Sequence, residues 1–156
     1  MVKSLKIPDP PITKDPKLND WLRWLIKTQQ QDFPYAQPYQ FWQQNVAASQ
    51  SAVAINASIS TNSEYTMELD GSVIGIAIAS NAARTAGTLT VDATVNGTAT
   101  SLQAILDGSN TTYHYATQLP EADTFSAGDR LGVDITTDGS WTPTTADIVV
   151  TVIVLK

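Results

Sequence analysis

Residues 71–100 read GSVIGIAIASNAARTAGTLTVDATVNGTAT, and they contain the clearest strand pattern of the chain. Apolar residues at 89, 91, 93 and 95 alternate with Thr or Asp at 88, 90, 92 and 94. This period of two predicts a β-strand with one buried face. Asn96-Gly97 follows directly, and these residue types accept the positive φ that both central positions of a type I′ turn require. The stretch therefore predicts a hairpin between strands at 87–95 and 98–106.

Strand patterns continue outward from this hairpin over most of the chain after residue 45. They predict about eight strands, at residues 46–60, 63–69, 72–80, 87–95, 98–106, 112–118, 130–136 and 147–155. Asp70-Gly71 predicts a second two-residue hairpin, between the strands at 63–69 and 72–80. No helical pattern occurs after residue 50. Short strands separated by turn residues predict a mainly β chain, with a single antiparallel β-sandwich of jelly-roll-like type.

Two of the expected strands, at 72–80 and 147–155, are apolar on both faces. In each, a row of Ile or Val on one face is backed by further apolar or small residues on the other. A strand of this kind is covered on both faces. In a two-layer sandwich, the second cover comes either from the N-terminal part of the chain or from another copy. The second faces therefore form a candidate oligomer interface: Gly75, Ala77, Ala79, Val149, Ile153 and Leu155.

Residues 1–45 differ in composition from the rest of the chain. They contain six of the eight prolines, seven of the twelve aromatic residues and no glycine, with six Lys/Arg against four Asp/Glu. Residues 46–156 contain all eight glycines, with three Lys/Arg against eleven Asp/Glu. We therefore expect an N-terminal arm over residues 1–45 and a β domain over residues 46–156. Within the arm, the Pro-rich residues 1–14 are expected to be extended or in polyproline II.

The middle of the arm carries a helix pattern. Asp15-Pro16 predicts a helix start, with Asp as the N-cap and Pro at the first helical position. Apolar residues at 18, 21, 22 and 25 then share one face of a helix expected over residues 16–31. Pro34 ends this pattern, and residues 32–42 are expected to be irregular. The helix either covers its own sandwich or binds a neighbouring subunit. The residues expected to bind a partner are Leu18, Trp21, Leu22, Trp24, Leu25, Phe33, Tyr35, Tyr39, Phe41 and Trp42.

Residue types that support catalysis are scarce, so we expect no enzyme activity and no cofactor. The chain has no cysteine, which excludes disulfides, Cys-ligated zinc and thiol catalysis. His114 is the single histidine, and no Gly-x-Ser-x-Gly elbow supplies a nucleophile. Carboxylates such as Glu64 with Glu68, or Glu121 with Asp123, have nothing that marks them as a catalytic pair.

Other ligand classes are only weakly indicated. Turns at 107–110 and at Asp134 with Asp138-Gly139 contain oxygen ligands for calcium but do not match an EF-hand loop. A net charge of −6 disfavours nucleic acid, no apolar run reaches 18 residues, and the N-terminus lacks the apolar segment of a secretion signal. Four aromatic residues are either core or a platform on which a glycan could stack: Tyr113, Tyr115, Phe125 and Trp141.

Two stretches resemble small bacteriophage virion proteins. In residues 71–100 an aliphatic strand is followed by a Gly-Thr-Leu strand and the Asn-Gly hairpin. Residues 125–154, FSAGDRLGVDITTDGSWTPTTADIVVTVIV, are similar to the same group. The entry at 127–130, Ala-Gly-Asp-Arg, is also similar to jelly-roll trimers of the tumour-necrosis-factor and C1q type. The two stretches together span about 60 residues.

The resemblance implies a homotrimeric jelly-roll protein located on the virion, with no catalytic residues. It implies a capsid decoration (cement) protein, whose partners are further copies of itself and the major capsid protein or another virion protein. Its N-terminal arm would then bridge neighbouring capsomers. The alternative is a tail or head fibre, or a receptor-binding protein whose β domain recognises host glycans. The arm itself, residues 1–45, carries no resemblance to a named family.

Overall fold

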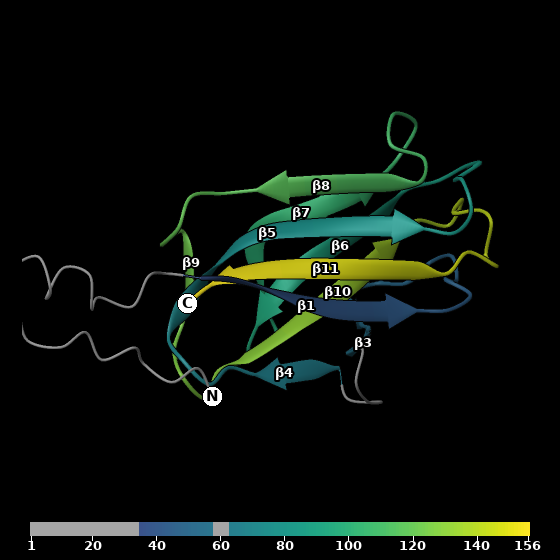
Figure 1. Ribbon diagram of the computed structural model, residues 1–156. Coiled ribbons are helices and arrows are strands. Elements are labelled where there is room, and N and C mark those ends of the chain that lie inside the picture. The colour runs from purple at the N-terminus through teal and green to yellow at the C-terminus, as the bar shows by residue number, and fades with distance from the viewer. Residues whose placement is uncertain (1–34, 58–62) are drawn as a thin grey trace, which may run out of the picture. The chain divides into compact units, whose positions relative to one another are not determined.

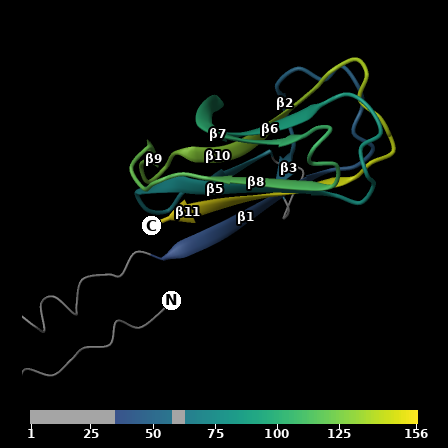
Figure 2. The ribbon, with the colours of Figure 1, turned by 90° about the horizontal axis from the view of Figure 1, so that it is seen from above.

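The computed structural model describes residues 35–57 and 63–156, which form two antiparallel sheets (Figure 1). The six-stranded sheet contains β1 (Ala36–Gln43), β3 (Asn56–Ala57), β5 (Gly71–Ser80), β8 (Tyr113–Thr117), β9 (Asp123–Phe125) and β11 (Ile148–Leu155). The five-stranded sheet contains β2 (Val53–Ala54), β4 (Glu64–Thr66), β6 (Leu89–Val95), β7 (Thr98–Leu106) and β10 (Arg130–Thr137). Figure 2 shows the sheets as two layers. The predicted β-sandwich is confirmed.

The order of strands explains how the layers are connected. The six-stranded sheet has the order β3-β1-β11-β5-β8, with β9 also paired to β5. The five-stranded sheet has the order β2-β10-β6-β7, with β4 also paired to β10. Consecutive strands lie in opposite sheets except at the β6–β7 hairpin and at β8–β9. This alternation is the expected jelly-roll-like connectivity.

The core lies between the two sheets and follows the period-two pattern. Inward positions of β6, β10 and β11 are fully or almost fully buried, as expected for strands with one face on the core. Phe41 and Trp141 are the largest of the buried side chains. The Trp141 indole N–H donates to the Val46 carbonyl at 3.2 Å, so its polar atom is satisfied inside the core. The strands at 72–80, 87–95, 98–106, 112–118, 130–136 and 147–155 are confirmed within two residues at each end.

One strand was not expected, because residues 32–42 read as irregular. The structure instead places β1 at Ala36–Gln43, paired along its whole length with β11, so the β domain begins about ten residues before the predicted boundary at residue 46. Tyr35 exchanges both backbone hydrogen bonds with Lys156, at 3.1 Å each. The backbone hydrogen bonds to β11 therefore come from every second residue of β1. Pro38, which has no N–H, falls at a position in between, where its nitrogen faces away from β11.

The second predicted hairpin is wrong. Asp70-Gly71 joins β4 to β5, but these strands belong to different sheets, so the chain crosses the sandwich at this point. Gly71 allows the backbone of β5 to lie close to that of β11, because a Cβ at this position would be 2.3 Å from the Leu155 carbonyl oxygen. The Asp70 side chain accepts a hydrogen bond from the Ala127 amide at 2.8 Å. The first hairpin is confirmed, since Asn96 and Gly97 have φ values of 53° and 74°.

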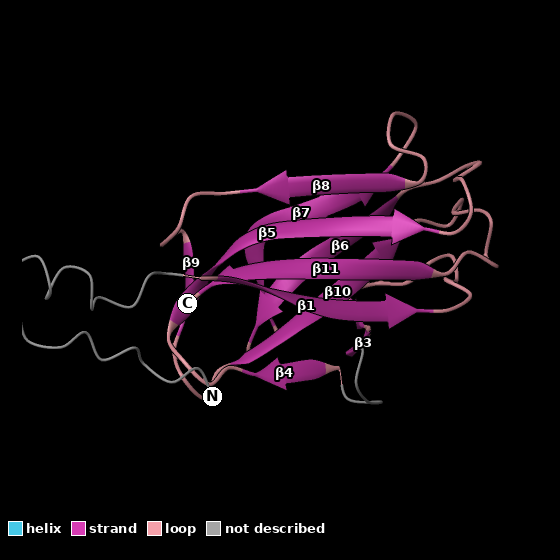
Figure 3. Cartoon of the chain, in the orientation of Figure 1, coloured by secondary structure: helices cyan, strands magenta, loops and turns pink. Residues whose placement is uncertain are grey.

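The remaining expectations concern short strands and the helix. Residues 46–60 were expected to form one strand, but the described part contains only the short β2 and β3. In the described residues, all elements are strands, as Figure 3 shows, and none is a helix that could cross a membrane. The helix expected over residues 16–31 lies outside the described residues.

Candidate interaction surface

The outer face of the six-stranded sheet is apolar across four strands. The register aligns Trp42 of β1, Val149 of β11, Ala79 of β5 and Tyr113 of β8 in one cross-strand row. The next row aligns Gln40, Thr151, Ala77 and Tyr115, and the third Pro38, Ile153, Gly75 and Thr117. We call these twelve residues the apolar face.

The largest side chains of the apolar face are exposed. Tyr113 and Tyr115 are 68% and 67% exposed, Val149 is 46% exposed and Trp42 is 36% exposed. Because these residues alternate with core residues along each strand, their exposure is fixed by the register and not by a flexible loop. A row of exposed aromatic and aliphatic side chains on a rigid sheet is the usual mark of a contact surface.

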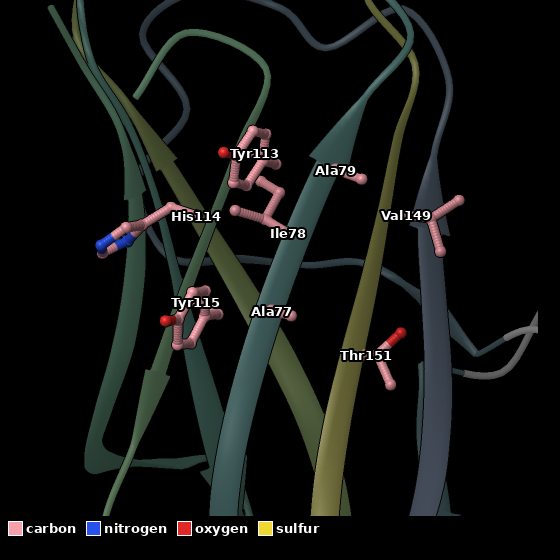
Figure 4. Close-up of a pocket in the computed structure, with 8 residues that line it drawn as sticks. All are labelled: Ala77, Ile78, Ala79, Tyr113, His114, Tyr115, Val149 and Thr151. Atoms are coloured by element: carbon pink, nitrogen blue, oxygen red, sulfur yellow. The ribbon is translucent and has the colours of Figure 1, made fainter. Parts of the chain in front are cut away.

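A shallow groove runs along the β8 half of the apolar face. Its volume is about 250 Å³. Figure 4 shows Tyr113 and Tyr115 standing on β8, with the small Ala77 and Ala79 beside them on β5. Val149 and Thr151 of β11 line the opposite side. We call this feature the tyrosine groove.

The outer face of the five-stranded sheet has the opposite chemistry. Asp92 of β6 and Asp134 of β10 lie directly across from each other. Burial raises the pKa of the Asp134 carboxyl, and the negative charges of Asp92 and Glu64 raise it further. Gln103 donates to Asp92 at 3.1 Å, and Glu64 pairs with Arg130 at 3.1 Å. One side of the sandwich is therefore polar and acidic, and the other is apolar.

The structure brings the predicted oligomer-interface residues together. Gly75, Ala77 and Ala79 lie on the outer face of β5, directly opposite Ile153, Thr151 and Val149 of β11. Leu155 is half-buried at the end of β11, beyond a register irregularity between Ile153 and Val154. Thr151 was not among the predicted residues. It could have been predicted, because the alternation along the strand puts it on the same face as Val149 and Ile153.

The expected partner-binding residues of the arm separate into three groups. Leu18, Trp21, Leu22, Trp24, Leu25 and Phe33 lie outside the described residues. Tyr35 and Trp42 are exposed. Tyr39 and Phe41 are core residues, 8% and 0% exposed, which corrects the expectation for these two: they face inward on β1 and contact Tyr65 edge-on, with ring centroids 5.0 and 5.3 Å apart.

The aromatic platform considered for glycans is not assembled as a group of four. Trp141 and Phe125 are core residues, 1% and 5% exposed, whereas Tyr113 and Tyr115 are on the apolar face. The sequence analysis left both roles open for all four residues. The alternation along β8 shows that Tyr113 and Tyr115 lie on one face of the strand and that His114 lies on the other.

His114 makes a structural contact between the two sheets. Its Nδ1 accepts a hydrogen bond from the Ile105 amide of β7 at 3.0 Å, which links the edge strands of the two sheets. The contact ties β8, and with it Tyr113 and Tyr115, to the other layer.

The acidic residues considered for chemistry hold turns or pair with other side chains. Hydrogen bonds from the Asn110 and Ser109 amides hold the pKa of Asp107 below its usual value, and the Ser140 amide does the same for Asp138. Glu68 pairs with Lys156 at 3.0 Å, and Asp123 accepts from Ser101. Within residues 35–57 and 63–156, no three His, Cys, Asp or Glu residues cluster as metal ligands do.

Comparisons with known proteins give structural likenesses only. No family model matches the chain, and no curated protein matches it in sequence. The Cyanophage Pam1 capsid asymmetric unit contains a similar chain, with 12% identity and a TM-score of 0.45, covering 78% of this chain and 85% of that chain. The acidic stable capsid of Helicobacter pylori bacteriophage KHP30 contains another, with 8% identity, a TM-score of 0.45, and 78% and 87% covered. The globular domain of the zebrafish complement 1qA protein has 13% identity, a TM-score of 0.41, and 77% and 96% covered. At these values the likenesses give no residue a role.

Proposed function

We propose that this chain is a structural protein of a bacteriophage particle, of the capsid decoration (cement) type. In this proposal it assembles as a homotrimer through the apolar face and attaches to a neighbouring capsid protein through its N-terminal residues. The apolar face is the observation that carries the proposal. The resemblance of residues 71–100 and 125–154 to small virion proteins supports the assignment to a virion.

The difference in polarity between the two outer faces of the sandwich supports a role in assembly. Val149, Tyr113, Tyr115 and Trp42 expose apolar surface on one side only, while Asp92 and Asp134 make the other side acidic. Burial of apolar area contributes about 25 cal/mol per Å², so a partner gains most by covering the first side. The acidic side remains hydrated and repels further copies that approach it.

The mechanism of attachment is multivalent binding. Three N-terminal arms on one trimer raise the effective concentration for each further contact once the first has formed, so modest single affinities combine into durable attachment. Because the compact unit at Tyr35–Lys156 contains β1, truncation before residue 32 leaves every described strand in place.

Deletion of residues 1–31 tests the attachment. We expect the truncated protein to leave purified particles, measured as copies per particle on gels, and the particles to lose resistance to heat. Leu119→Ser is the matched full-length control, because Leu119 is 81% exposed and lies outside the apolar face. Unchanged occupancy together with unchanged particle stability contradicts the proposed attachment.

A second candidate function is recognition of host glycans, as in a fibre or receptor-binding protein. The specific observation is that Tyr113 and Tyr115 expose two rings on one face of β8. A glycan-array signal that Tyr115→Ala abolishes would favour this function. Trp141 is unsuitable for the test, because its side chain is buried in the core.

A further inference from the structure

The tyrosine groove has the dimensions of a single extended chain. Its two walls stand on β8 and β11, which are two strand spacings apart, or about 9.5 Å. Ala79 and Ala77 of β5 form its floor, and the same outer row of β5 continues past the groove to Gly75, a rise of about 13 Å from Ala79. Because the floor residues are small, a flat sheet laid across the two walls would leave the hollow unfilled, at a cost in packing.

The chemistry of the groove favours a ligand that needs few hydrogen bonds. The walls offer Tyr rings and Val149, and the only side-chain polar atoms at the outer surface are the hydroxyls of Tyr113, Tyr115 and Thr151. A sugar has many hydroxyls to satisfy, and this lining has few partners for them. Proline-rich segments suit such a site, because proline has no N–H and its ring packs on aromatic faces.

The chain itself contains such a segment before its first described residue. Residues 7–12 read IPDPPI, in which Pro8 and Pro11 have the spacing of a P-x-x-P motif. A segment in polyproline II makes one turn in three residues, so in that conformation Pro8 and Pro11 would lie on the same side, about 9.3 Å apart. That distance is shorter than the outer row of β5 from Ala79 to Gly75, which includes the groove floor and its open end. We propose that residues 7–12 of one copy occupy the tyrosine groove of a neighbouring copy.

This inference rests on the proposed function, because it says what covers the groove in an assembly of several copies. The net charges of the two parts are opposite, which favours their encounter: residues 1–14 have three lysines against Asp9, whereas residues 35–156 have three Lys/Arg against eleven Asp/Glu. Length allows it as well. With residues 16–31 helical, residues 12–35 would span at most about 50 Å, which exceeds the roughly 30 Å diameter of a small domain.

Engineered cysteines test the contact in the full-length chain, which has no cysteine of its own. One preparation carries Ile12→Cys, and two others carry Ala79→Cys, in the groove floor, or Gly75→Cys, farther along the same outer row of β5. The preparations are dissociated in mild denaturant, mixed, reassembled and oxidised. We expect a disulfide-linked dimer that needs both the Ile12→Cys chain and one of the floor variants. Leu119→Cys replaces the floor variant as the control and is expected to give no dimer above background.

A second pair of variants tests the chemistry of the contact. Tyr115→Ser, or Pro8→Ser together with Pro11→Ser, is expected to lower the yield of that cross-link about tenfold, as truncation of an anchor does. Pro16→Ser, outside the motif, is expected to leave the yield unchanged.

The outcomes separate this inference from the proposed function. A dimer formed by Ala79→Cys chains alone shows that the sandwiches pack face to face; it supports self-assembly and overturns the occupation of the groove. A disulfide within a single chain that carries both cysteines overturns the exchange between copies. An assembly that forms without any cross-link overturns the inference alone. A protein that stays monomeric overturns both the inference and the proposed homotrimer.

Discussion

Two glycines of β5 are constrained in different ways within one strand. A Cβ on Gly71 would lie 2.3 Å from the Leu155 carbonyl oxygen and 2.7 Å from the Phe125 ring, whereas a Cβ on Gly75 would meet Ile153 at an ordinary 3.5 Å. The first position is closed by backbone that cannot move away, because Gly71 is paired with Phe125 and the next residue, Ser72, is paired with Leu155. The second lies on the outer face and has room.

We therefore expect Gly71→Ala to lower the free energy of unfolding by about 1–3 kcal/mol, the usual cost of overpacking. Gly75→Ala is the matched control and should change it by less than about 0.5 kcal/mol. Urea unfolding of both variants at one protein concentration measures the difference. Equal stabilities would show that the approach of β5 to β11 near Gly71 is looser than described.

Asp134 should make the fold less stable as the pH rises. Its pKa is raised above 3.8 by burial and by the charges of Asp92 and Glu64. The folded state therefore binds more protons than the unfolded state in the window from 3.8 up to the folded pKa, and stability falls as the pH rises through that window. We expect Asp134→Asn to raise the melting temperature at pH 7 and to leave it unchanged near pH 3, where Asp134 is protonated in both states. An Asn variant that is less stable at pH 7 contradicts this.

At the scale of elements, strands with a clean period of two could be predicted, and strands with mixed signals could not. The β6–β7 hairpin was predictable because Asn96-Gly97 supplies the turn and the alternation supplies the buried face. β1 was missed because residues 32–42, which follow the end of the predicted helix at Pro34, were expected to be irregular, although Tyr39 and Phe41 alternate with Pro38, Gln40 and Trp42. Asp70-Gly71 led to a wrong hairpin prediction because the dipeptide fits a two-residue turn. The actual pairing of β4 with β10 joins segments far apart in the sequence, and local patterns do not predict such a pairing.

The apolar face could likewise be predicted only where local patterns determine it. The small and aliphatic outer residues of β5 and β11 could be predicted, because both strands are apolar on both faces. The position of β8 next to β5 could not, because it depends on the order of strands in the sheet. The tyrosine groove exists only through that order, and Tyr113 and Tyr115 were therefore left between a core and a surface role.

Besides the backbone pairing of β6 with β10, the turn of the β6–β7 hairpin is held to the start of β10 by the Asn96 side chain. The Asn96 Oδ1 accepts from the Arg130 amide at 3.0 Å, and its Nδ2 donates to Asp129 at 2.9 Å. Asn96→Gly keeps the positive φ of the turn but removes both hydrogen bonds, so we expect it to destabilise the fold by about 1–2 kcal/mol.

A second readout distinguishes this tie from a general weakening of the fold. The hydrogen bond from Asn96 is the largest cause of the lowered pKa of Asp129, followed by that from the Ser126 amide. In Asn96→Gly the pKa of Asp129 should therefore move up toward its usual value, as measured by NMR titration. An unchanged pKa would mean that the Asn96 contact does not form in solution.

At the scale of the whole molecule, the two outer faces of the sandwich differ in polarity. The acidic face of the five-stranded sheet suits water, and the apolar face of the six-stranded sheet suits a protein surface. Every described strand of the six-stranded sheet except β3 and β9 contributes to the three rows of the apolar face. The central claim is therefore that the sandwich associates with copies of itself through this face.

The mass of the full-length protein in solution tests that claim most directly. We expect sedimentation to give a species of three times the 16.8 kDa of one chain. Ala77→Arg, which places a charge at the centre of the apolar face, should reduce it to one chain with unchanged circular dichroism, and Leu119→Arg should leave the assembly intact. A wild-type protein that remains a single chain at every concentration, or an Ala77→Arg variant that assembles as the wild type does, would contradict the account.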